Sequence, residues 1–329
     1  ISIYLIASIC WLIVLMAIDQ FELISIKVPS AIFFGALLCG ASQFLFSLRL
    51  ALWQMEERAT TYGLTQIFAT ALNFMLSVTL VFHFALGWEG RVYGITTAFF
   101  LFGLTCTLQL IYSGQVKFSR MSTHIKGALT YSLPLVPHTL ASTLLIFSER
   151  TAISSNIGDH QAGLYFAAFQ VATPVLILSN SLNLALKPWG YKNMQANKQD
   201  IVVRASYATM AVLLLASLIY MGLLQNFFGL IVGSAMSEGK FTSCVLVASC
   251  FFSGCYLIVA KGIMFTQQTK VLMYITVPIT LMFSFAVFFV DRIEEVAYLN
   301  LMFNISIFII VWYAANRIYP QPWFSKLKR

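Results

Sequence analysis

Ten apolar segments, each about as long as a membrane-spanning helix, make up most of this 329-residue sequence. A helix that crosses the hydrocarbon core of a bilayer needs about 20 mainly apolar residues. The segments run approximately over residues 1–18, 30–48, 62–85, 91–113, 127–147, 163–186, 201–221, 240–260, 271–289 and 296–315. The sequence therefore predicts an all-α, polytopic membrane protein with about ten transmembrane helices.

The composition agrees with this class. Hydrophobic residues make up 59% of the chain and charged residues only 10%, whereas soluble domains contain about 25% charged residues. The six cysteines all fall inside apolar segments, without the spacing of a metal site, and we interpret them as packing residues. We therefore expect neither a metal nor a cofactor.

The net charge of +8 raises the question of nucleic acid as a partner. Fifteen of the twenty basic residues, however, fall in one alternate set of loops and ends: Arg49, Arg58, Lys117, Arg120, Lys126, Lys187, Lys192, Lys198, Arg204, Lys261, Lys270, Arg317, Lys326, Lys328 and Arg329. Cytoplasmic loops collect Lys and Arg. This pattern predicts that both ends of the chain are cytoplasmic, and it explains the surplus charge without nucleic acid.

The connections between the segments are too short for a soluble domain. The segment at 226–239 is short and rich in glycine, so we expect an interfacial turn or short helix there rather than another span. The activity should therefore lie within the bilayer.

Polar residues recur at helical spacing in three of the spans. The three sets are Gln66, Thr70, Asn73 and Ser77; Gln170, Thr173, Asn180 and Lys187; and Tyr131, His138, Ser142 and Glu149. Each set lies on one helix face, and we interpret the three faces together as the lining of a hydrophilic cavity. Hydrogen bonds between neighbouring helices explain any single Ser or Thr equally well.

His138 and three prolines suggest how such a cavity could work. An imidazole titrates near pH 6.5, so His138 is a candidate for proton coupling; a neutral histidine bonded to a neighbouring helix is the alternative. Pro134 and Pro137 each remove a backbone donor from the same span, and Pro174 does so in another. We expect these prolines to mark hinges.

Charged residues near the ends of spans are the other site candidates. Glu149 is a second coupling candidate, and Arg150, Lys187 and Arg58 could supply positive charge toward an anionic substrate. Simple anchoring of Glu149 and Arg150 at the membrane interface is the alternative.

Several motifs resemble those of Wzx-type polysaccharide flippases, which belong to the multidrug/oligosaccharidyl-lipid/polysaccharide exporter superfamily. They are GALTYSLPLVPH from Gly127, the Glu149-Arg150 pair, IGDHQAGLYFAAFQVA over 157–172, and GWEGRVYG from Gly87. One departure is that an Asp-Arg pair is common where this chain has Glu149-Arg150, which keeps the charge.

The resemblance implies a two-lobe bundle of at least twelve helices around a central cavity. Aligning the Pro134/His138 helix with the seventh helix of the family leaves four spans in residues 1–116, as the remainder of the first lobe. Six spans and a short tail in 117–329 then form the second lobe. The first two helices of the first lobe would be missing from the sequence, which begins with Ile1.

The resemblance also implies a location in the cytoplasmic membrane of a bacterium, and a function. The substrate would be an undecaprenyl-diphosphate-linked oligosaccharide, carried from the cytoplasmic to the periplasmic leaflet for O-antigen, capsule or exopolysaccharide assembly. The partners would be this lipid-linked oligosaccharide, the membrane lipids, and a polymerase and chain-length regulator of the same pathway. The cavity residues expected to contact the substrate are Arg58, Gln66, Asn73, Tyr131, His138, Ser142, Arg150, Gln170, Asn180 and Lys187.

Two other function classes compete with this one. A multidrug exporter of the same superfamily would favour apolar cations, which the surplus of basic residues at the edge of the cavity and the expected absence of a deeply buried acid disfavour. An integral membrane enzyme, such as a polysaccharide polymerase or acyltransferase, would need a large external loop or an acid partner for His138, and neither is visible in the sequence. We therefore expect a transporter rather than an enzyme.

Overall fold

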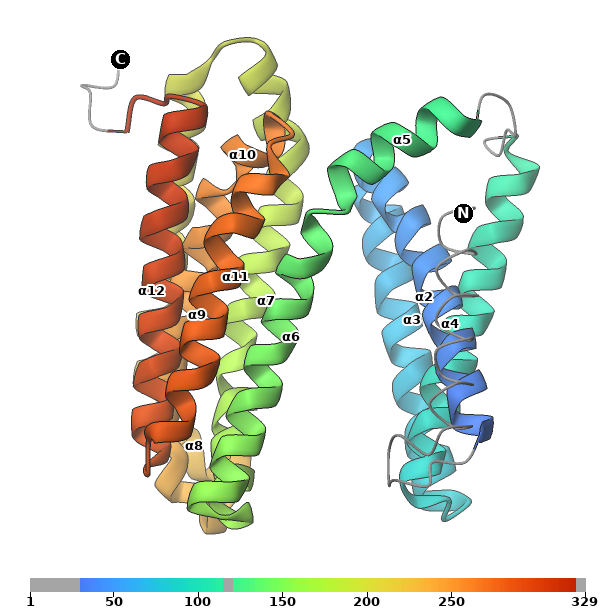
Figure 1. Ribbon diagram of the computed structural model, residues 1–329. Coiled ribbons are helices and arrows are strands. Elements are labelled where there is room, and N and C mark those ends of the chain that lie inside the picture. The colour runs from blue at the N-terminus through green and yellow to red at the C-terminus, as the bar shows by residue number, and fades with distance from the viewer. Residues whose placement is uncertain (1–29, 115–120, 324–329) are drawn as a thin grey trace, which may run out of the picture. The chain divides into compact units, whose positions relative to one another are not determined.

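The computed structural model describes residues 30–114 and 121–323, and nearly all of these are helical (Figure 1). Nine helices in these ranges are long and apolar enough to cross a membrane. The prediction of an all-α, multi-pass membrane protein is confirmed. The predicted span over residues 1–18 lies outside the described residues, as does the predicted boundary between residues 116 and 117.

The chain divides into two compact units, residues 1–125 and 126–329. The described helices of the first unit are α2 (Ser30–Met55), α3 (Ala59–Val78), a π-helical turn (Thr79–His83) that extends α3, and α4 (Gly87–Tyr112). Helix α5 (Met121–Ser132) leads into the second unit. There the helices are α6 (Leu135–Ala152), a π-helical turn (Ile153–Ile157), α7 (Asp159–Gln195), α8 (Gln199–Val232), α9 (Lys240–Val259), α10 (Lys261–Phe265), α11 (Thr269–Ala286) and α12 (Ile293–Ile318).

Glycines allow the helices of the first unit to pack closely. A Cβ atom added at Gly94 of α4 would lie 2.6 Å from Ser77 Oγ of α3, and one added at Gly103 would lie 2.6 Å from the Ser42 carbonyl oxygen of α2. Membrane helices cannot gain a hydrophobic driving force from lipid, so close backbone approach through small residues is a main source of their association. Helix α4 is thereby fixed against both neighbours.

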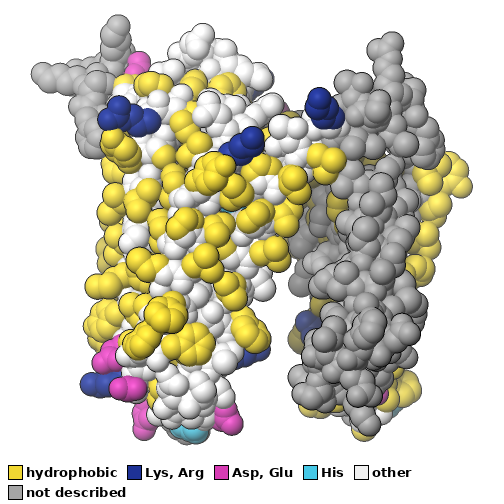
Figure 2. Space-filling view, viewed as in Figure 1, with side chains coloured by type: hydrophobic (Ala, Val, Ile, Leu, Met, Phe, Trp, Pro, Cys, Tyr) yellow, Lys and Arg dark blue, Asp and Glu magenta, His cyan; other side chains and the backbone are white. Residues whose placement is uncertain are grey.

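The core of the second unit surrounds α9, which packs against α7, α8 and α12. Of the 18-residue stretch that marks α9 as a candidate span, 61% is buried, more than in any other span of the described chain. The outer helices instead present large apolar side chains, which Figure 2 shows over the face in view. An apolar outer face is what a lipid environment requires.

The span predicted at residues 127–147 is not one continuous helix. Helix α5 ends at Ser132 and α6 begins at Leu135, with Pro134 in the capping position. Pro137 lies in the first turn of α6, where backbone N–H groups have no partner within the helix. The prolines thus lie where α6 begins, inside the candidate span Leu129–Ile157, and their role as hinges stays a prediction.

The segment at 226–239, predicted as an interfacial turn or short helix, is helical in two parts. Helix α8 continues to Val232, and only residues 234–239 form a separate 3₁₀ turn after Gly233. Gly233 has a positive φ of 88°, which a residue with a Cβ rarely adopts, so it ends the helix sharply.

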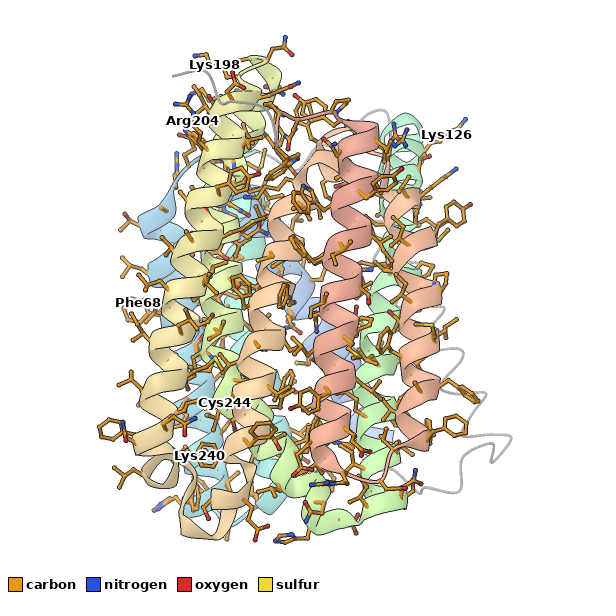
Figure 3. The ribbon with its side chains drawn as sticks, turned by 90° about the vertical axis from the view of Figure 1, so that its left-hand side faces the viewer. Phe68, Lys126, Lys198, Arg204, Lys240 and Cys244 are labelled. Carbon is orange, nitrogen blue, oxygen red and sulfur yellow. The ribbon has the colours of Figure 1, made fainter. Side chains whose placement is uncertain are left out.

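Charged residues are unevenly distributed along the second unit. Lys126, Lys198 and Arg204 lie near one end of the helices and Lys240 near the other (Figure 3). Figure 2 shows Asp and Glu side chains gathered at the end opposite the larger group of Lys and Arg. We call the end that holds Lys198 and Arg204 the basic end.

Candidate functional site

A buried carboxylate lies among the helices of the second unit. Glu149 of α6 is only 2% exposed, and its Oε1 accepts a hydrogen bond of 2.6 Å from Asn300 Nδ2 of α12. The phenol of Tyr165 on α7 lies beside the same carboxyl group without completing a hydrogen bond of normal geometry. Because an ionised carboxylate is costly to bury, a buried acid with so few donors points to a bound proton or cation.

The partners of Glu149 form a directed chain of hydrogen bonds. Asn304 Nδ2 donates to Ser249 Oγ at 2.8 Å, and Ser249 Oγ donates to Asn300 Oδ1 at 2.6 Å. Asn300 then donates to Glu149. Each donor in this chain is aligned toward the carboxyl group, and such alignment strengthens successive bonds. We call Glu149, Tyr165, Ser249, Asn300 and Asn304 the carboxylate cluster.

His138 lies on the same helix but in a neutral setting. Its Nδ1 is 2.8 Å from Thr276 Oγ1 of α11, and the Thr276 hydroxyl donates its proton to the Leu272 carbonyl oxygen. Thr276 must therefore accept from Nδ1–H, which leaves Nε2 to accept from the Tyr256 hydroxyl at 3.4 Å. Both ring nitrogens of a neutral imidazole are occupied.

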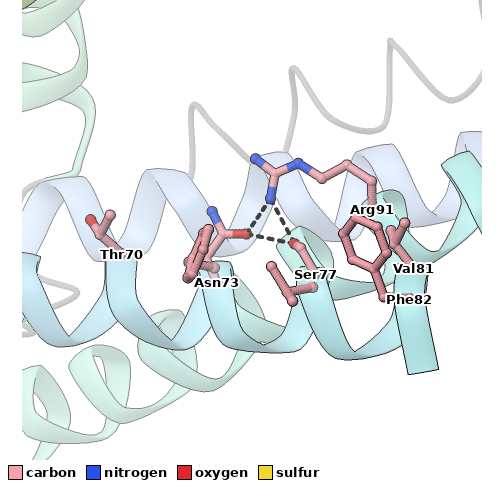
Figure 4. Close-up of a pocket in the computed structure, with 8 residues that line it drawn as sticks. Thr70, Asn73, Ser77, Val81, Phe82 and Arg91 are labelled. Atoms are coloured by element: carbon pink, nitrogen blue, oxygen red, sulfur yellow. Dashed lines mark hydrogen bonds between the residues drawn. The ribbon is translucent and has the colours of Figure 1, made fainter. Parts of the chain in front are cut away.

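In the first unit, part of the predicted polar face of α3 lines an open groove of about 390 Å³ (Figure 4). Arg91 of α4 crosses to it, and its Nη1 donates to Asn73 Oδ1 at 2.9 Å and to Ser77 Oγ at 2.6 Å. Thr70 lines the same groove together with apolar side chains such as Phe74 and Phe82. Gln66, one turn earlier, is exposed and is not among the lining residues.

The other residues predicted for the cavity lie in several separate places. Arg58 is exposed and pairs with Glu56 at 3.2 Å. Arg150 is exposed, and its guanidinium carbon lies 4.7 Å from the centre of the Phe166 ring. The Ser142 hydroxyl donates to the His138 carbonyl oxygen of its own helix.

Three more of the predicted positions lie on α7. Gln170, Pro174 and Asn180 are all exposed, and Pro174 is inside the helix. Lys187 and Tyr131 both contribute to a group of side chains at the basic end, where Lys187 Nζ lies 6.0 Å from the centre of the Tyr191 ring.

Several residues of these sites were not predicted. Asn300 and Asn304 are one helical turn apart in an apolar span, the same signal that marked α3, so spacing could have found them. Arg91 occurs in the sequence analysis only within the motif GWEGRVYG, and nothing in the sequence near it indicates that it contacts Asn73 and Ser77.

A search against protein-family models finds no match. Among curated proteins, the chain is similar to Lsg locus putative protein 1 of Haemophilus influenzae, with 22% identity over 302 residues that cover 88% of this chain and 74% of that protein.

The solved structures that resemble this chain are MATE transporters. A MATE protein in complex with MaL6 superposes with a TM-score of 0.79 at 13% identity, over 96% of this chain and 77% of that one. An outward-facing multidrug resistance MATE transporter of the MOP superfamily gives 0.76 at 12% identity, over 96% and 76%. A point mutant of the Vibrio cholerae MATE transporter VcmN gives 0.68 at 15% identity, over 96% and 77%. The chain thus has the all-α, multi-pass fold of MATE transporters.

Proposed function

We propose that the protein is a cation-coupled membrane exporter and that Glu149 binds the coupling proton. The fold shared with MATE transporters supports the exporter role. The observation that carries the coupling role is the enclosure of a carboxyl group at the end of a chain of donors. It is the one fully enclosed acid in the part of the chain that the structure describes.

The coupling step follows from the chemistry of the carboxylate cluster. With a proton bound, Glu149 is neutral and its burial between helices carries no charge penalty. When the proton leaves, the carboxylate keeps one direct donor, Asn300, in an interior of low polarity. Loss of the proton therefore favours an arrangement in which water reaches Glu149, and the packing of α6 against its neighbours changes with it.

His138 is the weaker coupling candidate of the two. Its bonds to Thr276 and Tyr256 satisfy a neutral ring, and no acid contacts it among the described residues. It is better suited to join α6 to α11 and α9 than to carry charge.

For the transported substrate we favour a lipid-linked oligosaccharide, moved from the cytoplasmic to the outer leaflet. Accessible amides on α3 and α7, namely Gln66, Asn73, Gln170 and Asn180, suit sugar hydroxyls. By the positive-inside rule the basic end would face the cytoplasm, where such a substrate is assembled. The polymerase and chain-length regulator of the same pathway would then be its partners.

A multidrug exporter is the second candidate, and the comparison with solved structures favours it. One of the similar structures is a multidrug resistance transporter. The expectation that no acid is deeply buried is wrong, because Glu149 is 2% exposed, and apolar cations would then bind near the carboxylate cluster.

Two assays in one strain separate the candidates. The strain should lack its own polysaccharide flippase and its own drug exporters, and the protein should be expressed in it. Restored surface polysaccharide without tolerance to cationic dyes supports the flippase, and the reverse supports the multidrug exporter. If the protein is present in the membrane and the strain shows neither phenotype, the exporter proposal is contradicted.

Glu149→Gln tests the coupling role in the same strain. The amide keeps the size of the side chain but cannot take up a proton, so we expect at least a hundredfold loss of whichever transport is observed. Glu238→Gln is the matched control, since Glu238 is an exposed acid and is not one of the residues of the carboxylate cluster. Equal activity of the two variants would remove Glu149 from the coupling mechanism.

A further inference from the structure

The groove in the first unit holds a positive charge that no described acid compensates. Among the described residues, the ion pairs are formed by two other arginines, Arg58 and Arg292, and Arg91 forms none. Glu89 is the nearest acid in the sequence, but residues two apart on a helix do not face each other. The charge of Arg91 is therefore available to a ligand.

The hydrogen bonds around Arg91 use up the acceptors and leave donors. Arg91 Nη1 donates to Asn73 Oδ1 at 2.9 Å and to Ser77 Oγ at 2.6 Å, and Ser77 Oγ donates to Asn73 Oδ1 at 3.2 Å. Within the described part of the chain, Nε and Nη2 of Arg91 and Nδ2 of Asn73 have no hydrogen-bond partner. Figure 4 shows one nitrogen of Arg91 turned toward Asn73 and Ser77, with the others turned away. A positively charged group of free donors is suited to an anion.

The Arg91 side chain extends into the span rather than out of it. A Cβ added at the preceding residue, Gly90, would lie 2.9 Å from the Leu80 carbonyl carbon, so Arg91 starts at about the level of Leu80. Its guanidinium reaches Asn73, which is seven residues earlier and thus about 10 Å further along α3 at 1.5 Å per residue. This direction leads away from the nearer end of α4 at Gly87. Basic side chains near the ends of spans usually extend to the interface instead. Water or an anion must therefore compensate for the charge inside the groove.

Most of the other side chains that line the groove are apolar. Phe74, Val78, Val81 and Phe82 lie along it, and Phe74 and Phe82 are 66% and 80% exposed. The volume of about 390 Å³ is within the range of small-molecule sites, about 300–1,000 Å³. The groove thus offers donors for one anionic end of a ligand and apolar side chains for the remainder.

The single guanidinium selects the kind of anion. Nε–H and one Nη2–H lie parallel on one edge of its plane, and two parallel N–H groups match the two oxygens of a carboxylate. Of the described residues that line the groove, Arg91 alone is charged, so the site compensates one negative charge. A phosphate monoester carries about 1.5–2. A monocarboxylate therefore fits the site better than a phosphate monoester or a diphosphate.

We propose that Arg91 and Asn73 bind the carboxylate of an amphiphilic organic acid whose apolar body lies along Phe74 and Phe82. Ser77 is a positioning residue, because its hydroxyl accepts a hydrogen bond from Arg91 and donates one to Asn73. This class of ligand differs from the apolar cations and from the lipid-linked oligosaccharides considered above. The site depends neither on the substrate proposed for the exporter nor on the carboxylate cluster.

Binding of cinnamate, a carboxylate with an apolar ring, tests the site without any transport. The protein is purified in an uncharged detergent, and the Kd is measured by isothermal titration calorimetry. We expect Arg91→Gln to raise the Kd at least about tenfold, because the amide carries no charge. Arg91→Lys should restore only part of the affinity, because an ammonium group lacks the pair of parallel donors.

Arg292→Gln is the matched control, since Arg292 is an exposed arginine that does not line the groove. If Arg91→Gln binds cinnamate as tightly as Arg292→Gln, or if the wild type does not bind it, the site is refuted.

Related ligands separate the two parts of the site. Cinnamyl alcohol has the same ring without the charge, and glucuronate has a carboxylate without an apolar ring. We expect each to bind at least about tenfold more weakly than cinnamate. Equal affinity for cinnamyl alcohol would refute the anion site, and equal affinity for glucuronate would overturn the assignment in favour of an acidic sugar. Strong competition by phosphatidylglycerol would overturn it in favour of membrane phospholipid.

The apolar part of the site is tested at Phe82. Phe82→Ala should raise the Kd for cinnamate several-fold, because the ring of the ligand loses its contact. Phe84→Ala is the matched control, since Phe84 is also exposed but does not line the groove. Equal affinities of the two variants would contradict the proposed placement of the apolar body.

Thermal unfolding of the same samples shows whether the variants are folded. Arg91 is exposed, so Arg91→Gln without ligand should melt close to the wild type. Cinnamate should raise the Tm of the wild type and of Arg292→Gln and leave that of Arg91→Gln unchanged. An equal rise in all three proteins would contradict binding at Arg91.

Discussion

The polar faces of α3 and α6 look alike in the sequence but have different surroundings in the structure. On α3, Asn73 and Ser77 meet Arg91 in an open groove. On α6, His138 and Glu149 are bonded to side chains of other helices inside the second unit. The neighbouring helices account for the difference. Helix α4 places the Arg91 side chain in the groove, whereas α11 and α12 place Thr276 and Asn300 in the interior of the second unit. Helical spacing alone therefore does not distinguish a wet face from a bonded one.

Removal of the buried acid should have the largest effect on stability. Glu149→Ala leaves a cavity and an amide of Asn300 without its acceptor, so we expect a loss of about 2–4 kcal/mol in the free energy of unfolding. Chemical unfolding in detergent measures it, with the exposed Glu238→Ala as the control. Equal stability of both variants would show that the carboxylate cluster is not closed.

Gly94→Ala should have the next largest effect, a loss of about 1–3 kcal/mol in the free energy of unfolding. Its Cβ would lie 2.6 Å from Ser77 Oγ and 2.8 Å from Ser77 Cα, so α3 and α4 must separate. At Gly63 of α3 a Cβ meets nothing within 4 Å, and Gly63→Ala should be neutral or stabilising by up to about 1 kcal/mol. Melting curves of the two alanine variants give the comparison, and equal curves would contradict close packing at Gly94.

Replacement of His138 should lower the free energy of unfolding by less, about 1–2 kcal/mol. His138→Ala removes the bonds to Thr276 and Tyr256, each of which is worth about 1 kcal/mol. We expect the pH profile of transport in proteoliposomes to stay the same, because the ring is held neutral. A profile that shifts by a unit or more would return His138 to the coupling mechanism.

The smallest effect should be that of Asn73→Ala, a change within about 0.5 kcal/mol in the free energy of unfolding, because Arg91 keeps its bond to Ser77 and the groove is open.

Labelling of introduced cysteines compares the accessibility of the polar faces in the two units. In a cysteine-free background, a water-soluble maleimide should label Asn73→Cys rapidly and Asn300→Cys, at an 8% exposed position, slowly. Equal labelling rates would remove the distinction between an open face and a bonded one.

The sequence alone predicts an all-α membrane protein, because the length of each apolar segment is a local property of the sequence. It also located an interruption near Pro134 inside a span, and helix α6 begins there within the candidate span Leu129–Ile157. The carboxylate cluster could not be derived, since Glu149 and Asn300 are 151 residues apart and their pairing depends on how α6 and α12 pack. Arg91 shows the same limit, because its hydrogen bonds to Asn73 and Ser77 depend on how α3 and α4 pack.

The junction of α5 and α6 has a mechanical consequence. Pro134 and Pro137 have no N–H groups, so two rungs of the helical ladder are absent there whatever the angle between the helices. Turning α5 relative to α6 at this point would disturb side-chain contacts. It would break no backbone hydrogen bond at Pro134 or Pro137, because neither residue has a donor. The resistance to bending at residues 133–137 then comes from the backbone bonds that remain there, such as that from Val136 N–H to the Leu133 carbonyl oxygen at 3.2 Å, and from the side chains that touch the junction.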